Sequence, residues 1–369
     1  MVDFLRLDFL HKTVDALLYP GGAYLFVRLV TASYAVSAIG RLIPVRRKQV
    51  PRFHRKPLRT AGIATVAVGI AVAATACTTT LIPAFRPRSA RHTAAAPPAH
   101  TAPALRLGVF EPGEEATYKP VDQFAAAVGR QPDILLTYSG WHEPFHFHFA
   151  DMAWAHHAEP FIQIEPVGVS LSSIVQGRSD GYLRSYADQV RAYGHPVILS
   201  FAAEANGNWY KWGWTHTPPS VWRAAWRHVV TIFRRQHATN VTWLLTFFES
   251  FPGSGPIHDY WPGAKWVNWV GIDGYYYHPR DTFASVFGAD IKQIRRVTNA
   301  PILISETAVG PDTGDQARRI ASLFTGIQKN HLLGLVWFDK NQYEGIYHQR
   351  WRLENNPAAV AEFRKAMKS

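Results

Sequence analysis

The chain has 369 residues, of which 47% are hydrophobic, enough to bury a large core and to exclude a wholly disordered protein. Residues up to Leu105 include 14 Lys and Arg and 3 Asp and Glu, a net charge of +11. The remainder includes 25 Lys and Arg and 24 Asp and Glu, a net charge of +1. A nucleic-acid groove needs its positive charge on the folded domain, so this distribution of charge argues against a nucleic-acid partner.

The N-terminal third predicts a membrane anchor. Residues 1–60 read as a basic cytoplasmic region, and the uncharged residues 61–85 exceed the roughly 20 that a helix needs to cross a bilayer. Positive charges from Arg46 to Arg59 mark the cytoplasmic flank, which places the rest of the chain outside. A cleaved signal peptide and a buried core helix are the alternatives. Cys77, the one cysteine, lies in this run, so no disulfide can form within the chain.

Residues 86–104 are almost all Pro, Ala, Arg, Ser, Thr and His, a composition typical of a flexible linker. We therefore expect a single-pass protein of the cell membrane whose folded domain, residues 105–369, lies outside. A secreted protein is the alternative if the apolar segment is cleaved.

From Arg106 onward, short apolar runs alternate with helical patterns. The expected strands are Leu107–Phe110, Ile134–Tyr138, Pro160–Ile164, Val197–Phe201, Val241–Phe247, Trp269–Ile272, Ile302–Ser305 and Leu333–Phe338. Eight apolar strands in about 260 residues suit an α/β fold of the (β/α)8 or TIM-barrel type. An open doubly wound sheet is the alternative, but no Gly-rich phosphate loop follows an early strand.

Four helices are legible between and after these strands. They are Asp180–Tyr193, with Asp180 as the expected cap, then Ser220–His237, Thr313–Asn330 and Pro357–Met367.

Two of the strands are each followed by a single carboxylate, Glu204 and Glu306. In a barrel the active site lies at the carboxyl ends of the strands, so both side chains are expected there. Either glutamate alone would as readily be a helix cap or an ion-pair partner. Two on matching strand ends suit a reaction in which one carboxylate attacks and the other carries protons, and sugar hydrolysis is the commonest of these.

Aromatic side chains crowd the same loops and suggest a sugar site, because a flat indole stacks on the apolar face of a sugar ring. Trp209 and Trp212 follow Glu204, Trp141 follows an earlier strand, and Trp337 ends the last one. Packing over the barrel top is the alternative. The remaining substrate-binding candidates are Asn206, His142 and Glu165.

Five histidines lie within a short span and raise the question of zinc. They are His142, His146, His148, His156 and His157. No H-E-x-x-H spacing accompanies them and no cysteines are available, so the sequence predicts neither a metal site nor a cofactor.

The ordered motifs resemble glycoside hydrolase family 26, the β-mannanase-type retaining enzymes of clan A, over roughly Leu105 to the C-terminus. They are Gln163-Ile-Glu165-Pro, Glu204-Ala-Asn-Gly-Asn-Trp-Tyr-Lys-Trp212, Tyr260-Trp-Pro-Gly263, Trp269-Val-Gly-Ile-Asp273-Gly-Tyr275, Ile304-Ser-Glu306, Trp337-Phe338 and Trp351-Arg352.

The resemblance implies roles for individual residues. Glu204 would be the acid/base and Glu306 the nucleophile, Tyr275 would orient the nucleophile, and Trp209 would line the sugar site. Retention implies carboxyl groups about 5–5.5 Å apart and double displacement through a glycosyl-enzyme. The acid should have a raised pKa, so that it stays protonated while its partner is charged.

Two positions depart from the family pattern. Ala203 stands where the family usually has His, and Phe247-Phe248 replaces residues that are often polar. Both carboxylates remain, so the sequence predicts a monomeric retaining hydrolase of β-linked polysaccharide or oligosaccharide, with β-mannan as the default and β-glucan or β-xylan as alternatives. A non-hydrolytic carbohydrate-binding or polysaccharide-export accessory protein on the same fold is the competing class, and transglycosylation would use the same residues.

Overall fold

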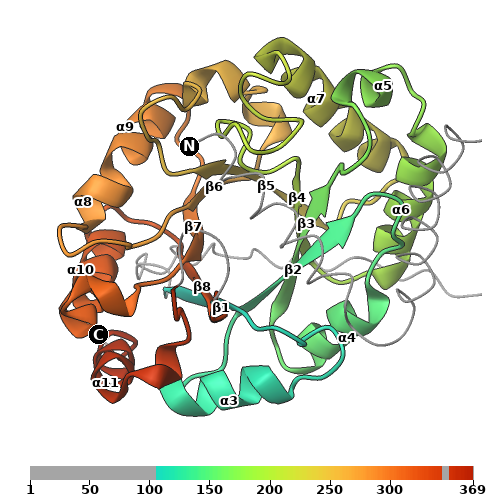
Figure 1. The fold of residues 1–369 in the computed structure, drawn as a ribbon. Coiled ribbons are helices and arrows are strands. Elements are labelled where there is room, and N and C mark those ends of the chain that lie inside the picture. The colour runs from blue at the N-terminus through green and yellow to red at the C-terminus, as the bar shows by residue number, and fades with distance from the viewer. Residues whose placement is uncertain (1–104, 343–348, 369) are drawn as a thin grey trace, which may run out of the picture. The chain divides into compact units, whose positions relative to one another are not determined.

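The computed structural model describes residues 105–342 and 349–368. Eight parallel strands close into a barrel in sequence order, with β1 hydrogen-bonded to β8 (Figure 1). The strands are β1 Arg106–Phe110, β2 Ile134–Gly140, β3 Glu159–Glu165, β4 Val197–Phe201, β5 Val241–Phe248, β6 Trp269–Asp273, β7 Ile302–Thr307 and β8 Gly334–Phe338. All eight expected strands and the closed TIM barrel are confirmed, with ends that differ by two residues at most.

Helices surround the barrel and cover the outer face of every strand (Figure 1). The α-helices are α3 Lys119–Val128, α4 Phe147–Ala155, α5 Leu171–Val175, α6 Asp180–Tyr193, α7 Pro219–Arg235, α8 Phe283–Val286, α9 Gly288–Val297, α10 Gln316–Lys329 and α11 Pro357–Ala366. Short 3-10 turns are η1 Ile257–Tyr260, η2 Ala264–Trp266, η3 Pro311–Thr313 and η4 Leu353–Asn355.

The helix ends follow local signals with two corrections. Gly194 ends α6 in the left-handed region at φ 76°, as expected for a glycine in this position. Asp180 is the first residue of α6 rather than its cap, and its carboxylate instead pairs with His228 Nε2 at 2.7 Å. The helix expected over Thr313–Asn330 begins only at Gln316, because Gly314 breaks the chain at φ 83° and Asp315 caps the helix through the backbone N–H of Arg318.

The barrel has two apolar cores. Alternate residues of the strands fill its interior: Ile134, Leu136, Phe161, Ile198, Leu244, Leu303 and Val336, all fully buried. The other face of each strand packs against the helices in a larger core. The same alternation carries the next inward-facing side chains to the carboxyl ends of the strands, which is where a barrel places its active site.

The predicted regions 1–60, 61–85 and 86–104 lie outside the described residues. Within 105–342 and 349–368, no helix has the length and apolar character needed to cross a bilayer.

Candidate active site

Glu306 lies in β7 at a register irregularity. The pairing of β7 shifts between Ile304 and Thr307 against β8, and a matching shift occurs at Asp273 of β6. Because of this irregularity, two successive side chains both face the barrel interior, where strict alternation would allow only one. Ser305 Oγ donates to Asp273 Oδ1 at 2.6 Å, while the carboxylate of Glu306 points into the mouth of the barrel.

Three donors from three other strand segments hold that carboxylate. Oε1 accepts from the Tyr138 hydroxyl at 2.6 Å and from Gln163 Nε2 at 2.9 Å, and Oε2 accepts from the Tyr275 hydroxyl at 2.6 Å. Burial, followed by the negative charge of Glu306, raises the pKa of both tyrosines well above the usual value. Both hydroxyls therefore keep their protons and act as donors to a fixed anionic group.

An arc of aromatic rings continues from these tyrosines around the barrel mouth. Phe110 of β1 contacts Tyr138 at 5.3 Å between ring centroids and stacks on Phe338 of β8 at 4.9 Å. Phe338 meets Tyr275 edge-on at 5.9 Å, and Trp351 packs on Tyr275 at 5.2 Å. The arc restricts both tyrosines to the orientation in which they reach Glu306.

Glu204 lies in a strained turn after β4. Ala202 and Glu204 have φ of 48° and 55°, a region that residues with a side chain rarely occupy. The turn is held by the amide of Glu204, which donates to the Thr246 carbonyl at 3.0 Å. Two indoles also donate to it, Trp222 to the carbonyl of Ala202 at 3.1 Å and Trp212 to that of Ala203 at 2.8 Å. Backbone strain that neighbouring groups hold in place is typical of functional sites.

The carboxylate of Glu204 accepts a hydrogen bond from Trp209 Nε1 at 2.8 Å. The Trp209 ring packs edge-on against Phe248 at 4.9 Å and stacks with Phe251 at 5.8 Å. It also lies directly against Gly207, where a side-chain carbon would collide with the ring, so the Asn-Gly sequence is needed for this approach. Trp209 remains partly exposed and is the aromatic platform beside Glu204.

Both carboxylates belong to the same end of the barrel, since β4 and β7 are parallel. Glu306 reaches from β7 across the mouth to Gln163 on β3, and β3 is the hydrogen-bonded neighbour of β4, which Glu204 follows. Glu204 is 4% exposed and Glu306 1% exposed, so each is almost fully shielded from water.

Three other predicted site residues lie at the carboxyl ends of β2 and β3. Trp141 is 8% exposed and packs on Tyr182 at 4.8 Å. His142 is exposed with φ 74°, and Glu165 is the half-buried last residue of β3. They stand at the rim, where a long substrate would pass.

Three predicted substrate contacts have enclosed side chains with partners inside the protein. Trp337 points outward from β8, packs on Phe363 of α11 and is 0% exposed. Trp212 is 2% exposed, and its indole holds the backbone of the Glu204 turn. Asn206 is 0% exposed, and its amide both donates to the carbonyl and accepts from the N–H of Phe248, so it joins two loops.

Sequence reasoning missed Tyr138 and Gln163 as partners of Glu306. A signal was available, since both lie two residues beyond a core-facing position, Leu136 and Phe161, and a strand repeats its inward face every second residue.

One of the five histidines, His146, lies in a local polar network. His146 lies between Glu115 at 3.5 Å and Glu143 at 3.3 Å. Burial lowers the pKa of His146, but hydrogen bonds and charge from these two glutamates outweigh it and raise the pKa to about 9. A protonated imidazole does not ligate a metal.

Comparison with known proteins agrees with this geometry. Residues 166–322 match the sequence profile of Glycosyl hydrolase family 26. Endoglucanase H of Acetivibrio thermocellus is 28% identical over 279 residues, which cover 71% of this chain and 30% of the relative. The β-1,3-xylanase TXYA of a Vibrio species is 28% identical over 148 residues, which cover 38% of this chain and 30% of that protein. The chain thus matches less than a third of the length of these curated relatives.

A double mutant of an endo-β-1,4-mannanase from Cellulomonas fimi shares the fold, with a TM-score of 0.56 and 16% identity over 72% of this chain and 70% of that one. The closed barrel and the two carboxylates at its mouth agree with the class of (β/α)8-barrel glycoside hydrolases. Within that class, residues 166–322 of the chain are similar to glycosyl hydrolase family 26.

Proposed function

We propose that the barrel is a retaining glycoside hydrolase that cleaves β-linked polysaccharide, with Glu306 as nucleophile and Glu204 as acid/base. The observation that carries this proposal is the cradle of Glu306, in which three side-chain donors orient one carboxylate at the barrel mouth. Three hydrogen-bond donors to the same carboxylate suit an anion that must stay in one orientation to attack one carbon atom.

The reaction has two steps. A Glu306 oxygen attacks the anomeric carbon while Glu204 gives its proton to the leaving glycosidic oxygen, which yields a glycosyl ester and a free chain end. Glu204 then takes a proton from water, whose oxygen attacks the same carbon, breaks the ester and frees Glu306. Two inversions leave the β-configuration unchanged.

We propose β-glucan as the first substrate to test, ahead of β-mannan. The relatives at 28% identity are named as an endoglucanase and a β-1,3-xylanase, whereas the C. fimi mannanase shares 16% identity and supports only the fold. Ala203, beside the acid/base, offers a methyl group where a family histidine would offer a ring nitrogen. The prediction of β-mannan as substrate is therefore weakened, because this chain lacks the family histidine at position 203.

Trp209 would carry a sugar ring close to Glu204, with Trp141, His142 and Glu165 along the rim on the side of β2 and β3.

We further propose that the apolar segment 61–85 anchors the protein with this barrel outside the membrane. Protease treatment of intact cells tests this, because an outward barrel is removed while an inward one is protected.

The full-length chain should be screened against β-1,3- and β-1,4-linked glucan, xylan and mannan, with the anomeric configuration of fresh products followed by NMR. We expect β-products from at least one of them, and none from Glu306→Ala. Initial α-products would overturn the retaining scheme. Binding without hydrolysis would favour the carbohydrate-binding alternative.

A further inference from the structure

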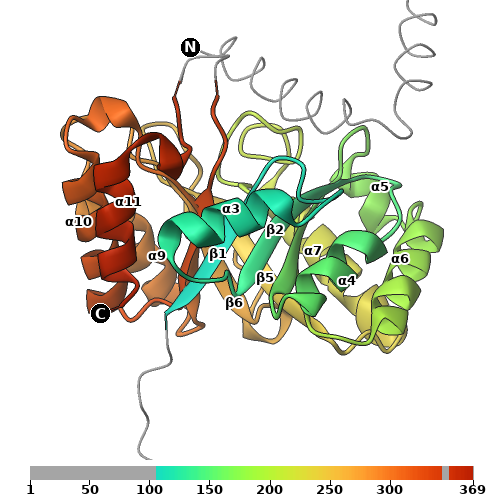
Figure 2. The same ribbon diagram turned by 90° about the horizontal axis from the view of Figure 1, so that it is seen from below.

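The connection that follows β8 returns to the barrel mouth as a short antiparallel pair. Asn341 bridges to Arg350, and the amide of Gln342 donates to the carbonyl of Gln349 at 2.8 Å. Figure 2 shows the two arms rising from the end of the barrel at which the strands finish. The second arm continues through Trp351 and Arg352 into η4.

Trp351 connects this pair to the nucleophile. Its side chain is 0% exposed and lies against the rings of Tyr275 at 5.2 Å and Tyr277 at 5.5 Å. Its indole N–H donates to Gln342 Oε1 at 2.7 Å, which ties the two arms together. Gly310, four residues after Glu306, lies directly against the side chains of Gln349 and Trp351, which occupy the space where its own side chain would stand. Trp351 is therefore wedged between Tyr275 and the segment that follows the nucleophile.

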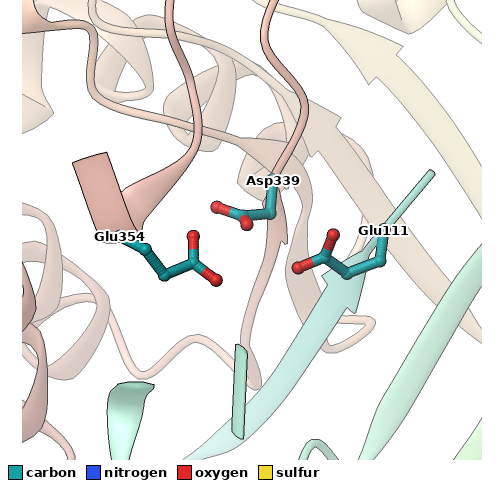
Figure 3. Close-up of side chains that lie close together, drawn as sticks. All are labelled: Glu111, Asp339 and Glu354. Atoms are coloured by element: carbon teal, nitrogen blue, oxygen red, sulfur yellow. The ribbon is translucent and has the colours of Figure 1, made fainter. Parts of the chain in front are cut away.

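Beside Trp351, three carboxyl groups converge from separate segments: Glu111 after β1, Asp339 after β8 and Glu354 in η4 (Figure 3). Their oxygens lie within 4.8 Å of one another, and Glu111 and Asp339 are fully buried. Arg352 Nη2 lies 3.4 Å from Glu111, 3.5 Å from Asp339 and 3.6 Å from Glu354. We call these four residues the Arg352 clasp.

Such a group of acids resembles a cation site, but the guanidinium of Arg352 already supplies the cation. A divalent ion would have to displace it. The clasp balances its remaining charge with protons, since burial and then the charge of Asp339 raise the pKa of Glu111 to about 11. Burial and Glu354 likewise raise the pKa of Asp339 to about 7. Asp339 Oδ1 also accepts from the Leu353 amide at 2.7 Å, which fixes η4 to the end of β8.

We propose that Arg352 and Trp351 are positioning residues for the nucleophile. The clasp fixes the backbone of residues 351–353 to β1 and β8, Trp351 presses on Tyr275, and Tyr275 holds Oε2 of Glu306. This inference rests on the proposed function. Under this proposal, Arg352 and Trp351 do more than pack: they influence the reactivity of the Glu306 carboxylate, which neither residue contacts.

The test measures the nucleophile directly in the full-length chain. A 2-deoxy-2-fluoro-β-cellobiosyl fluoride, with its mannobiosyl counterpart, reacts once: a Glu306 oxygen bonds to the anomeric carbon, the C–F bond breaks and fluoride leaves. Mass spectrometry locates the label, and the dependence of the rate on inhibitor concentration separates the maximal labelling rate from the binding constant.

The variants are Arg352→Met and Trp351→Leu, with Arg352→Lys and Trp351→Phe as conservative partners. Arg318→Met is the matched control, because Arg318 forms an exposed ion pair with Asp315 near the start of α10. We expect Arg352→Met and Trp351→Leu to lower the maximal labelling rate by about tenfold or more with an unchanged binding constant, as a misplaced reactive group does. Lys and Phe should restore most of the rate, and Arg318→Met should match the parent chain.

Equal labelling rates in all folded variants would overturn the positioning role while leaving the proposed function intact. No labelling of the parent chain by either fluoride would overturn both. If Arg352→Met or Trp351→Leu does not fold, Gln342→Leu decides, because it removes the acceptor of the Trp351 indole N–H. A lower maximal labelling rate together with an acid limb of the pH profile shifted upward supports the role, and an unchanged rate and profile contradict it.

Discussion

The two carboxylates at the barrel mouth are held in opposite ways. Glu306 lies within a strand, and side chains of Tyr138, Gln163 and Tyr275 aim three donors at its oxygens. Glu204 lies in a turn with positive φ, and much of its support reaches the backbone, through indole bonds to the two preceding carbonyls.

This difference suits different tasks. A nucleophile must stay charged and point at one atom, so donors on the carboxylate itself serve it. A proton carrier changes its charge twice in each cycle, so donors to the carboxylate would favour only one of its two states. The indole bonds to the backbone fix the position of Glu204 in both states, and Trp209 Nε1 adds a donor to its carboxylate.

The largest expected effect is on the reaction rate when either Glu306 or Glu204 is replaced, and the choice of substrate distinguishes their two roles. Glu306→Gln should lower kcat on polysaccharide by about a thousandfold or more, because no covalent intermediate can form. Glu204→Gln should lose a comparable factor on polysaccharide but far less in the first step with a dinitrophenyl β-glycoside, whose leaving group needs no proton. Stopped-flow release of dinitrophenol and steady-state assays measure both.

Azide is the control for this pair, since it attacks a glycosyl-enzyme without a base. It should accelerate turnover of the Glu204 variant and leave Glu306→Gln inactive. Rescue of the Glu306 variant with retained configuration would reverse the assignment.

The cradle of Glu306 should show the next largest effect. Tyr275→Phe and Tyr138→Phe each remove a hydrogen bond to a charged group, worth about 1.5–3 kcal/mol, so kcat should fall roughly tenfold to a hundredfold. Tyr193→Phe is the matched control, because the Tyr193 hydroxyl donates to the Ala150 carbonyl on the outer side of the barrel and does not contact Glu306. The prediction is wrong if all three variants have the same kcat.

The support of the Glu204 turn should show a smaller effect on rate. Trp212→Phe leaves the Ala203 carbonyl without its indole donor, which should cost about 1–3 kcal/mol of unfolding free energy. The loosened turn should lower kcat about threefold to tenfold. Trp226→Phe removes a similar bond, to the Trp266 carbonyl, without touching the turn.

Urea unfolding and steady-state kinetics of both tryptophan variants decide this point. Comparable losses of stability with a lower kcat only in Trp212→Phe would support the role of the turn. Equal kcat values would reduce Trp212 to a packing residue.

The smallest effect concerns pH and the Arg352 clasp. In the folded protein, where Glu111 faces Asp339, Arg352 and Glu354, burial and then the charge of Asp339 raise the pKa of Glu111, so that it differs from the ordinary value of 4.5 in the unfolded chain. Folding therefore takes up a proton between the two pKa values, and this contribution to stability is present at low pH and falls as the pH rises. Tm from pH 6 to 9 should fall less steeply in Glu111→Gln than in the parent chain. Parallel curves would show that Glu111 titrates normally.

Much of the fold was predictable because local patterns agree with the global one. Eight buried apolar runs separated by helix-forming stretches leave few alternatives to a closed parallel barrel. The polar residues at the carboxyl ends of β4 and β7 must then meet at one end, and this placed Glu204 and Glu306 together. The shift at β7 that turns Glu306 inward has no comparable signal, since it depends on pairing with β6 and β8.

By itself, the sequence determined the barrel, the end that carries the site and the two strand-end carboxylates, because strand period and chain order dictate all three. Only the tertiary structure decided that Trp337 faces α11, that Trp212 and Asn206 brace loops, and that Tyr138 and Gln163 reach Glu306. Only it brought Glu111, Asp339 and Glu354 around Arg352. Those contacts join segments as much as 243 residues apart in sequence, so closure of the barrel and the packing of its loops set them, and no local pattern encodes either.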